Sequence, residues 1–99
     1  MAEVVFLLAA ELDVQAAYEW LDEQREGRGD QFLTRLREVE VLLSRNPHVG
    51  VRVDSSIRKI LVPRFDYGVF YTIEGQRIMV AAVLDLRRDP EFIRSRLGL

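Results

Sequence analysis

The apolar positions in the last third of the chain predict two adjacent β-strands. Residues 69–73 are β-branched or aromatic, and residues 78–84 are apolar at every position. The connection between them, at residues 74–76, is short and contains a glycine, which predicts a hairpin turn. Because a strand that does not alternate is usually covered on both faces, we expect residues 78–84 to lie in the middle of a sheet.

The start of the chain predicts a strand and then a helix. Residues 4–8 form a short apolar run that predicts a buried strand, with the first turns of the following helix as the alternative. From about Ala10 to Gln24 the apolar residues recur at helical spacing and form one face of an amphipathic helix. These residues are Val14, Ala17, Tyr18 and Leu21. Two carboxylates are expected in its first turn, Glu11 and Asp13, and two glycines at its end, Gly27 and Gly29.

A second apolar stripe predicts another helix directly after the first. Asp30 is a candidate N-cap, and Asn46 with Pro47 would end the helix. The stripe consists of Phe32, Leu33, Leu36, Val39 and Leu43. Because only a few residues join the two helices, we expect an antiparallel helical hairpin whose apolar stripe packs on a sheet.

The remaining segments complete a predicted α+β fold. Residues 47–56 predict a loop, and residues 57–62 predict a strand that Pro63 ends. Asp89 and Pro90 signal the start of a short C-terminal helix. The predicted order is β-α-α-β-β-β, followed by that helix. The helical hairpin would lie on one face of a mainly antiparallel sheet, and residues 1–99 would form a single domain.

Composition and charge narrow the classes of function. The absence of cysteine excludes disulfides, thiolate metal sites and a cysteine nucleophile. The apolar run at residues 4–10 is too short to cross a membrane, so we expect a cytoplasmic protein without a membrane partner. The net charge is −2, but residues 1–50 carry 5 basic and 10 acidic side chains, whereas residues 51–99 carry 9 and 6. The C-terminal half is therefore the better place for an anionic partner.

Three motifs, in this order, resemble the RelE/ParE superfamily, the toxins of type II toxin–antitoxin pairs. The resemblance extends from about Val4 to Arg94. The motifs are Ala10-x-x-Asp13-Val14-x-x-Ala17-x-x-Trp20-Leu21, Arg64-Phe65-x-Tyr67-x-Val69-x-Tyr71 and Arg87-Arg88-Asp89-Pro90. The resemblance implies one of two activities: metal-free cleavage of messenger RNA in the ribosome, or inhibition of DNA gyrase. It also implies a cognate antitoxin as protein partner, a hetero-oligomer with it, and no cofactor or metal.

The resemblance also implies which residues would cleave RNA. A ribonuclease of this superfamily would hold phosphate with four basic residues: Lys59, Arg64, Arg87 and Arg88. Its other functional positions fall on residues that cannot do the same chemistry: Gly68 in place of an arginine, Leu61 in place of a lysine, and Phe92 in the region of a tyrosine. The cations are therefore partly present, and the groups that move protons are mostly absent.

The same resemblance suggests contact residues for a protein target and for an antitoxin. For the target they are Arg87, Arg88, Arg64 and Tyr67, and for the antitoxin they are Trp20, Arg58 and Phe70. Two arginines side by side can bind phosphate or carboxylate in a bidentate manner, but one of them could instead pair with Asp85 or Asp89.

The remaining candidates favour structural roles, although for two of them a second interpretation stays open. Trp20 belongs to the edge of the core or to a partner surface, and the core is favoured. Tyr67 and Tyr71 would pack under the helices, although Tyr67 could also reach a groove. His48 predicts a solvated loop residue. The acidic run of Asp22, Glu23 and Glu26 predicts a solvated helix face.

From these observations the favoured hypothesis is a ParE-like toxin that inhibits DNA gyrase and is neutralised by an antitoxin. The alternatives are a RelE-like ribosome-dependent endoribonuclease and an inactive binding module with the toxin fold.

Overall fold

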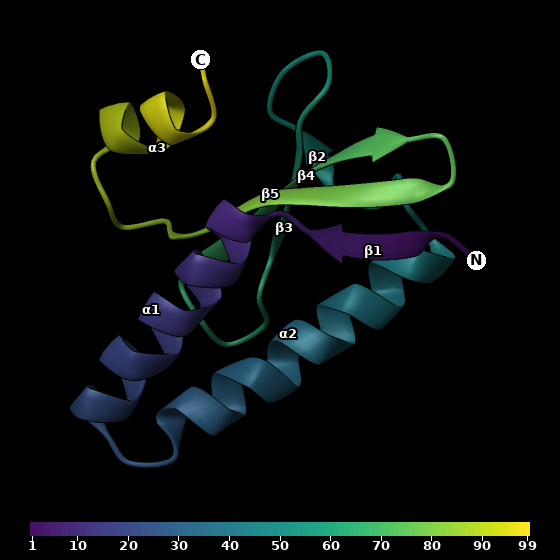
Figure 1. The fold of residues 1–99 in the computed structure, drawn as a ribbon. Helices are drawn as coiled ribbons and strands as arrows, with labels where there is room; N and C mark the ends of the chain where they lie inside the picture. The colour runs from purple at the N-terminus through teal and green to yellow at the C-terminus, as the bar shows by residue number, and fades with distance from the viewer.

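A five-stranded sheet forms the centre of the computed structural model, which describes residues 1–99 (Figure 1). In spatial order its strands are β1 (Glu3–Phe6), β5 (Arg77–Asp85), β4 (Tyr67–Glu74), β3 (Arg58–Leu61) and β2 (Val51–Arg52). All neighbouring pairs are antiparallel except β1 and β5, which are parallel. The expected α+β class and the mainly antiparallel sheet are confirmed.

The continuous apolar run of β5 is explained by cover on both faces of the sheet. β5 lies between β1 and β4, as expected for a strand without alternation. The pairing shifts register so that Phe70 faces Ala82 but Tyr71 faces Val80, which leaves Ala81 as an extra residue in β5. Such a bulge reverses which side chains reach each face. Before it Ile78 and Val80 join one core, and after it Val83 joins the same core while Ala82 and Leu84 join a second.

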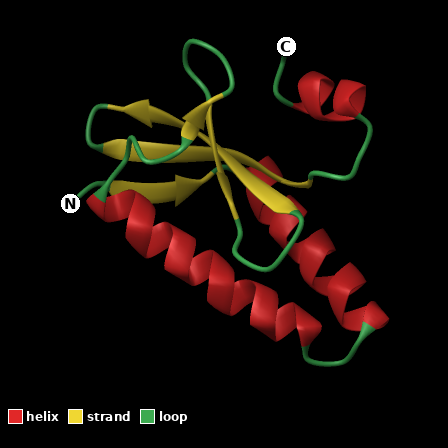
Figure 2. Cartoon of the chain, turned by 180° about the vertical axis from the view of Figure 1, so that it is seen from behind, coloured by secondary structure: helices red, strands yellow, loops and turns green.

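The two long helices cover one face of the sheet. They are α1 (Leu8–Gln24) and α2 (Arg28–Arg45), and they lie together on one side of the strands (Figure 2). The ring of Phe32 on α2 packs edge-on against Phe65 and Tyr67, with centroids 5.3 and 5.1 Å apart. None of the helices is both long and apolar enough to cross a lipid bilayer.

The junction between α1 and α2 differs from the sequence prediction. Gly27 is the N-cap residue of α2, with φ of 88°, so Asp30 lies in the first turn and does not cap it. Gly29 lies inside α2, where a Cβ atom would come within 2.7 Å of the Tyr18 ring. The prediction that Asp22 lies on a solvated helix face is wrong. Its carboxylate accepts the N–H groups of Gly27 and Gly29, at 3.0 and 3.1 Å, and so connects the two helices.

The C-terminal helix covers part of the opposite face. α3 (Pro90–Arg96) begins where the sequence predicts: the Asp89 side chain accepts the Glu91 N–H at 2.9 Å, and Pro90 is in the first turn. Its apolar residues pack against the second core. They are Phe92 and Ile93, with Leu97 just beyond the helix. The end of β5 is therefore enclosed between α1 and α3.

The predicted loop at residues 47–56 contains a strand that the sequence analysis missed. β2 is only two residues long, too short to show a period of two, and it pairs with Arg58 and Lys59 of β3. The segment before it is held by Tyr71. The Tyr71 hydroxyl accepts the Gly50 N–H at 3.0 Å and donates to the Pro47 carbonyl at 2.7 Å, and the tyrosine is fully buried.

We expect Tyr71→Phe to lower the free energy of unfolding by about 1–3 kcal/mol, because it leaves a buried Gly50 N–H without an acceptor. Denaturant unfolding of both proteins measures the difference. Tyr18→Phe is the matched control, since it removes a hydroxyl that bonds Asp30 at the surface, and its effect should be clearly smaller. Equal losses for the two variants would contradict the anchoring role of Tyr71.

Candidate functional site

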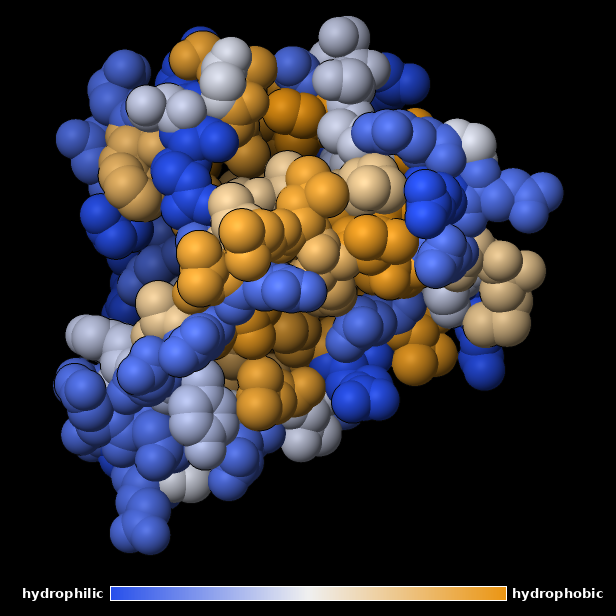
Figure 3. Space-filling view, viewed as in Figure 1, coloured by the Kyte–Doolittle hydropathy of each residue, from blue (hydrophilic) through white to orange (hydrophobic).

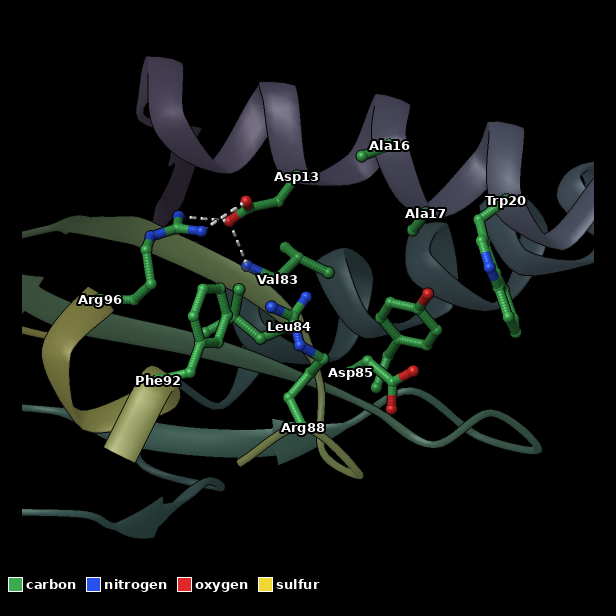
Figure 4. Close-up of a pocket in the computed structure, with 11 residues that line it drawn as sticks. Asp13, Ala16, Ala17, Trp20, Val83, Leu84, Asp85, Arg88, Phe92 and Arg96 are labelled. Atoms are coloured by element: carbon green, nitrogen blue, oxygen red, sulfur yellow. Dashed lines mark hydrogen bonds and ion pairs between the residues drawn. The ribbon is translucent and has the colours of Figure 1, made fainter. Parts of the chain in front are cut away.

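A pocket of about 400 Å³ opens between α1, the end of β5 and α3 (Figure 4). We call it the β5-end pocket. Its aromatic lining consists of Trp20, Tyr67 and Phe92, and its charged lining consists of Asp13, Asp85, Arg88 and Arg96. The smaller residues between them are Ala16, Ala17, Val83 and Leu84. An apolar cavity with a few convergent charged groups is the usual form of a binding site.

Asp13 ties together the three elements that form the pocket. β1 ends at Phe6, opposite Val80, so the edge of β5 beyond that point has no strand partner. The Asp13 carboxylate of α1 accepts the Val83 N–H there at 3.0 Å. It also accepts two bonds from the Arg96 guanidinium just beside it, at 2.9 and 2.8 Å (Figure 4). The Asp13 side chain thus satisfies a backbone N–H of β5 that has no strand partner, and it also binds the C-terminal helix to α1.

Arg87 is occupied by a structural ion pair. Its guanidinium donates to both oxygens of Asp85, at 3.1 and 2.8 Å, and lies 3.9 Å from Asp66. The bonds from Arg87 hold the pKa of Asp85 below its ordinary value, and the same contact raises the pKa of Arg87. Of the two expected alternatives for the arginine pair, pairing with Asp85 is therefore found for Arg87, whereas Asp89 caps α3.

Arg88 is the guanidinium that remains open to a ligand. None of the ion pairs in the chain involves it. Its terminal carbon lies 3.9 Å from the centre of the Phe92 ring, so the cation is held over an aromatic face at the edge of the pocket. The two neighbouring arginines, which the sequence presents as equivalent, thus differ: Arg87 is paired and Arg88 can bind an anion.

Tyr67 forms a buried wall of the pocket. Burial, followed by the nearby charge of Asp85, raises the pKa of its phenol above the ordinary value. The hydroxyl therefore stays protonated at neutral pH, while Asp85 and Arg87 stay charged. Such fixed charge states suit recognition better than proton transfer, which needs a group that titrates near the working pH.

Trp20 lies at the mouth of the pocket and not in the core. Its side chain is 44% exposed, so the favoured core interpretation was wrong. The Arg87 guanidinium lies 5.8 Å from the centre of its ring. Tryptophan and arginine are the residue types that are enriched where proteins contact one another.

Four other predicted residues lie away from the pocket. Lys59 and Phe70 face the opposite side of the sheet, where Phe70 is buried in the second core that α3 covers. Arg58 donates to the carbonyls of His48 and Gly50, at 3.1 and 2.8 Å, and so holds the β2 segment. Arg64 lies in the turn between β3 and β4, with φ of 71°, and does not line the β5-end pocket. The structure therefore does not gather the four proposed phosphate-binding residues into one site.

Two residues of the site escaped the sequence analysis. Asp13 was assigned to the first turn of a helix as a dipole partner, but α1 begins at Leu8, so Asp13 lies further along and reaches β5. No pattern in the sequence around Arg96, the partner of Asp13, indicates a role in the site. No group of three or more His, Cys, Asp or Glu side chains is placed to hold a metal ion.

The fold is that of a small α+β protein with a pocket at the end of β5, and a comparison with known structures shows the same architecture. A structure of the chromosomal ParDE toxin–antitoxin system from P. aeruginosa matches with a TM-score of 0.65 and 12% sequence identity. The match covers 87% of this chain and 97% of that one, and it shows the fold. No protein of curated function matches the sequence.

The family follows from a second comparison. The model of the ParE toxin of type II toxin–antitoxin systems, parDE, matches residues 4–90, and the chain belongs to this family. The expected membership of the RelE/ParE superfamily, on its ParE-like branch, is confirmed.

We expect Asp13→Ala to lower the free energy of unfolding by about 1–3 kcal/mol, because it removes the acceptor of the Val83 N–H and the partner of Arg96. Hydrogen exchange separates the two roles. The Val83 amide should lose protection in Asp13→Ala but keep it in Arg96→Gln, which leaves the Asp13 carboxylate in place. Equal exchange at Val83 in both variants would contradict the direct bond.

Proposed function

We propose that the chain inhibits DNA gyrase by binding it in the cytoplasm, and that a cognate antitoxin protein neutralises this activity. The observation that supports a binding function is the electrostatic state of the β5-end pocket. Its carboxylates are held by arginines, its phenol stays protonated, and Arg88 is left open to an anionic group. These groups recognise a partner without exchanging protons.

The alternative of ribosome-dependent RNA cleavage has less support. Cleavage needs cations around one phosphate and a group that moves a proton. Lys59 and Arg88 line one groove on the sheet face opposite the long helices, but no histidine, aspartate or glutamate side chain lines that groove. His48, the only histidine, is exposed on the loop before β2 and does not line that groove. A binding role therefore fits the geometry better than catalysis.

The contact with a target would centre on Arg88 and Trp20. Arginine and tryptophan are the residue types that dominate binding energy at protein interfaces. Both line the β5-end pocket, and the exposed ring of Trp20 offers apolar area for a contact. Tyr67 would act as the fixed wall that shapes the pocket.

We expect the purified chain to inhibit supercoiling by DNA gyrase and to leave protein synthesis in a cell-free extract unaffected. Arg88→Ala should weaken the inhibition at least about tenfold, because it removes the open cation of the pocket. Arg45→Ala, which removes an equal charge at the end of α2, is the matched control and should inhibit like the unmodified chain.

The outcomes of this pair of assays are distinct. Cleavage of messenger RNA in the extract would replace the gyrase proposal with the ribonuclease. No effect in either assay, from a folded preparation, would point to an inactive binding module. Inhibition that Arg88→Ala and Arg45→Ala share equally would remove the pocket from the account.

An exposed apolar patch at the start of α1 is our proposed contact for the antitoxin. Figure 3 shows hydrophobic residues gathered in the middle of this face, over the beginning of α1 and the β1–β5 part of the sheet. Leu7, Leu8 and Leu12 are exposed there, and Leu8 is 71% accessible. A neighbouring groove between α1, α2 and β1 is lined by Phe6 and Val14. Contiguous exposed apolar surface of this kind is typical of a protein interface.

We expect Leu8→Asp combined with Leu12→Asp to abolish neutralisation by the antitoxin, because two charges in an apolar interface cannot be desolvated cheaply. The measurement is growth of cells that co-express the chain and the product of the adjacent reading frame. Val49→Asp, an exposed apolar position on another loop, serves as control and should remain neutralised. Full neutralisation of the double variant would exclude this patch as the contact.

A further inference from the structure

The hydroxyl of Tyr67 is a hydrogen-bonding group that the chain itself does not use. The hydroxyls of the other two tyrosines, Tyr18 and Tyr71, are both bonded within the chain. Tyr67 is only 7% exposed, yet its hydroxyl takes part in no such bond. Because every fully enclosed polar side-chain atom of the chain has a partner, this hydroxyl must open into the β5-end pocket that Tyr67 lines. A tyrosine this deeply buried normally finds a partner, so its hydroxyl is available to a ligand of the pocket.

The Arg88 guanidinium is a second unused donor of the same pocket. Of the four charged residues that line it, Asp13, Asp85 and Arg96 take part in ion pairs, and Arg88 does not. The Arg88 side chain extends toward the centre of the pocket (Figure 4). Burial and the charge of Asp85 raise the pKa of the Tyr67 phenol, and the charge of Arg88 acts against them, so the two donors lie near each other. A carboxylate can accept from both donors at once.

The remainder of the pocket is aromatic and apolar. Its three rings come from three elements: Trp20 from α1, Tyr67 from β4 and Phe92 from α3. Two small side chains of α1, Ala16 and Ala17, lie between them and leave room for a ring. Aromatic rings gain from edge-to-face and offset contacts with one another, so a flat side chain binds better here than an aliphatic one.

The size and the mouth of the pocket favour a protein as the source of that ring. At about 400 Å³ the pocket is near the lower end of the range of small-molecule sites, so it admits one or two side chains and not a helix or a strand. Trp20 is 44% exposed at the mouth. A small molecule inside the pocket would leave that surface in water, whereas a protein around an inserted side chain would cover it.

We infer that the target protein inserts one aromatic side chain into the β5-end pocket and pairs a neighbouring carboxylate with Arg88 and Tyr67. The ring packs on Ala16 and Ala17, and the surface of the target around it covers Trp20. The carboxylate accepts from the Arg88 guanidinium and from the Tyr67 hydroxyl. An anchor of this kind, enclosed in a pocket and surrounded by weaker contacts, carries most of the binding energy of a protein interface. The assignment rests on the proposed function, because it takes the β5-end pocket as the contact for the target.

The first test measures how the full chain binds a capped tetrapeptide of glycine, phenylalanine, aspartate and glycine, in that order. Trp20 is the only tryptophan, so its fluorescence reports on the mouth of the pocket. The peptide is titrated into the millimolar range, because a two-residue anchor binds weakly. We expect a saturable change that weakens about tenfold when leucine replaces phenylalanine or asparagine replaces aspartate. Equal binding of either control peptide, or no binding of the first peptide to the folded chain, would overturn the inference.

Substitutions in the chain test the two donors separately. Tyr67→Phe keeps the ring, so it should weaken peptide binding about three- to tenfold and leave the midpoint of denaturant unfolding unchanged. Arg88→Gln should weaken binding at least about tenfold. The matched control is Arg94→Gln, which removes the same charge from α3 outside this pocket and should bind like the unmodified chain. Unchanged binding by Tyr67→Phe, or equal losses in the two arginine variants, would contradict the assignment.

A supercoiling assay distinguishes failure of this contact from failure of the proposed function. An excess of the peptide that contains aspartate should relieve the inhibition of gyrase by the chain, and the asparagine peptide should not. Inhibition that persists while the peptide is bound would refute the contact and leave the action on gyrase standing. Peptide binding by a folded chain that does not inhibit gyrase would refute the action on gyrase and support the same pocket chemistry toward another protein.

Discussion

The extra residue in β5 determines which side chains of this strand enter each of the two hydrophobic cores. If β5 were regular and had no bulge at Ala81, every second residue would continue to face the long helices, and Ala82 and Leu84 would follow Ile78 and Val80 into that core. The bulge instead sends Val83 to the long helices and Leu84 to α3. One strand can therefore be apolar throughout and still serve two separate cores. The end of the strand, with Asp85 and the two arginines, emerges between the helices that cover these cores.

The ion pairs at this end of the sheet hold the shape of the β5-end pocket and leave few of its charged groups free. Asp13 takes Arg96, and Asp85 takes Arg87, each through two hydrogen bonds. The Asp13 carboxylate also serves a backbone donor where β1 has ended, so its position is determined from three directions. Groups that are satisfied in this way hold the walls of the pocket in place. The remaining guanidinium, on Arg88, is the one whose charge is available to a partner.

The elements of the fold could be predicted because their signals are local. The apolar period of the helices, the glycine turn before β5 and the Asp89-Pro90 start of α3 each lie within a few residues of sequence. The site could be predicted only in part, because its geometry depends on distant residues. Asp13 and Arg96 are 83 positions apart, and nothing in either neighbourhood points to the other. The exposure of Trp20 likewise depends on how far α1 extends beyond the sheet, which periodicity does not measure.

The contrast between Arg87 and Arg88 shows how a motif acquires its function from the strand before it. Asp85 lies two residues before Arg87, near enough for the carboxylate to accept both its backbone N–H and its guanidinium. Arg88 makes no ion pair with that carboxylate, and its guanidinium lies over the Phe92 ring at the edge of the β5-end pocket. Arg87 therefore holds the end of β5 in place, and Arg88 supplies the charge that a ligand of the β5-end pocket could pair with.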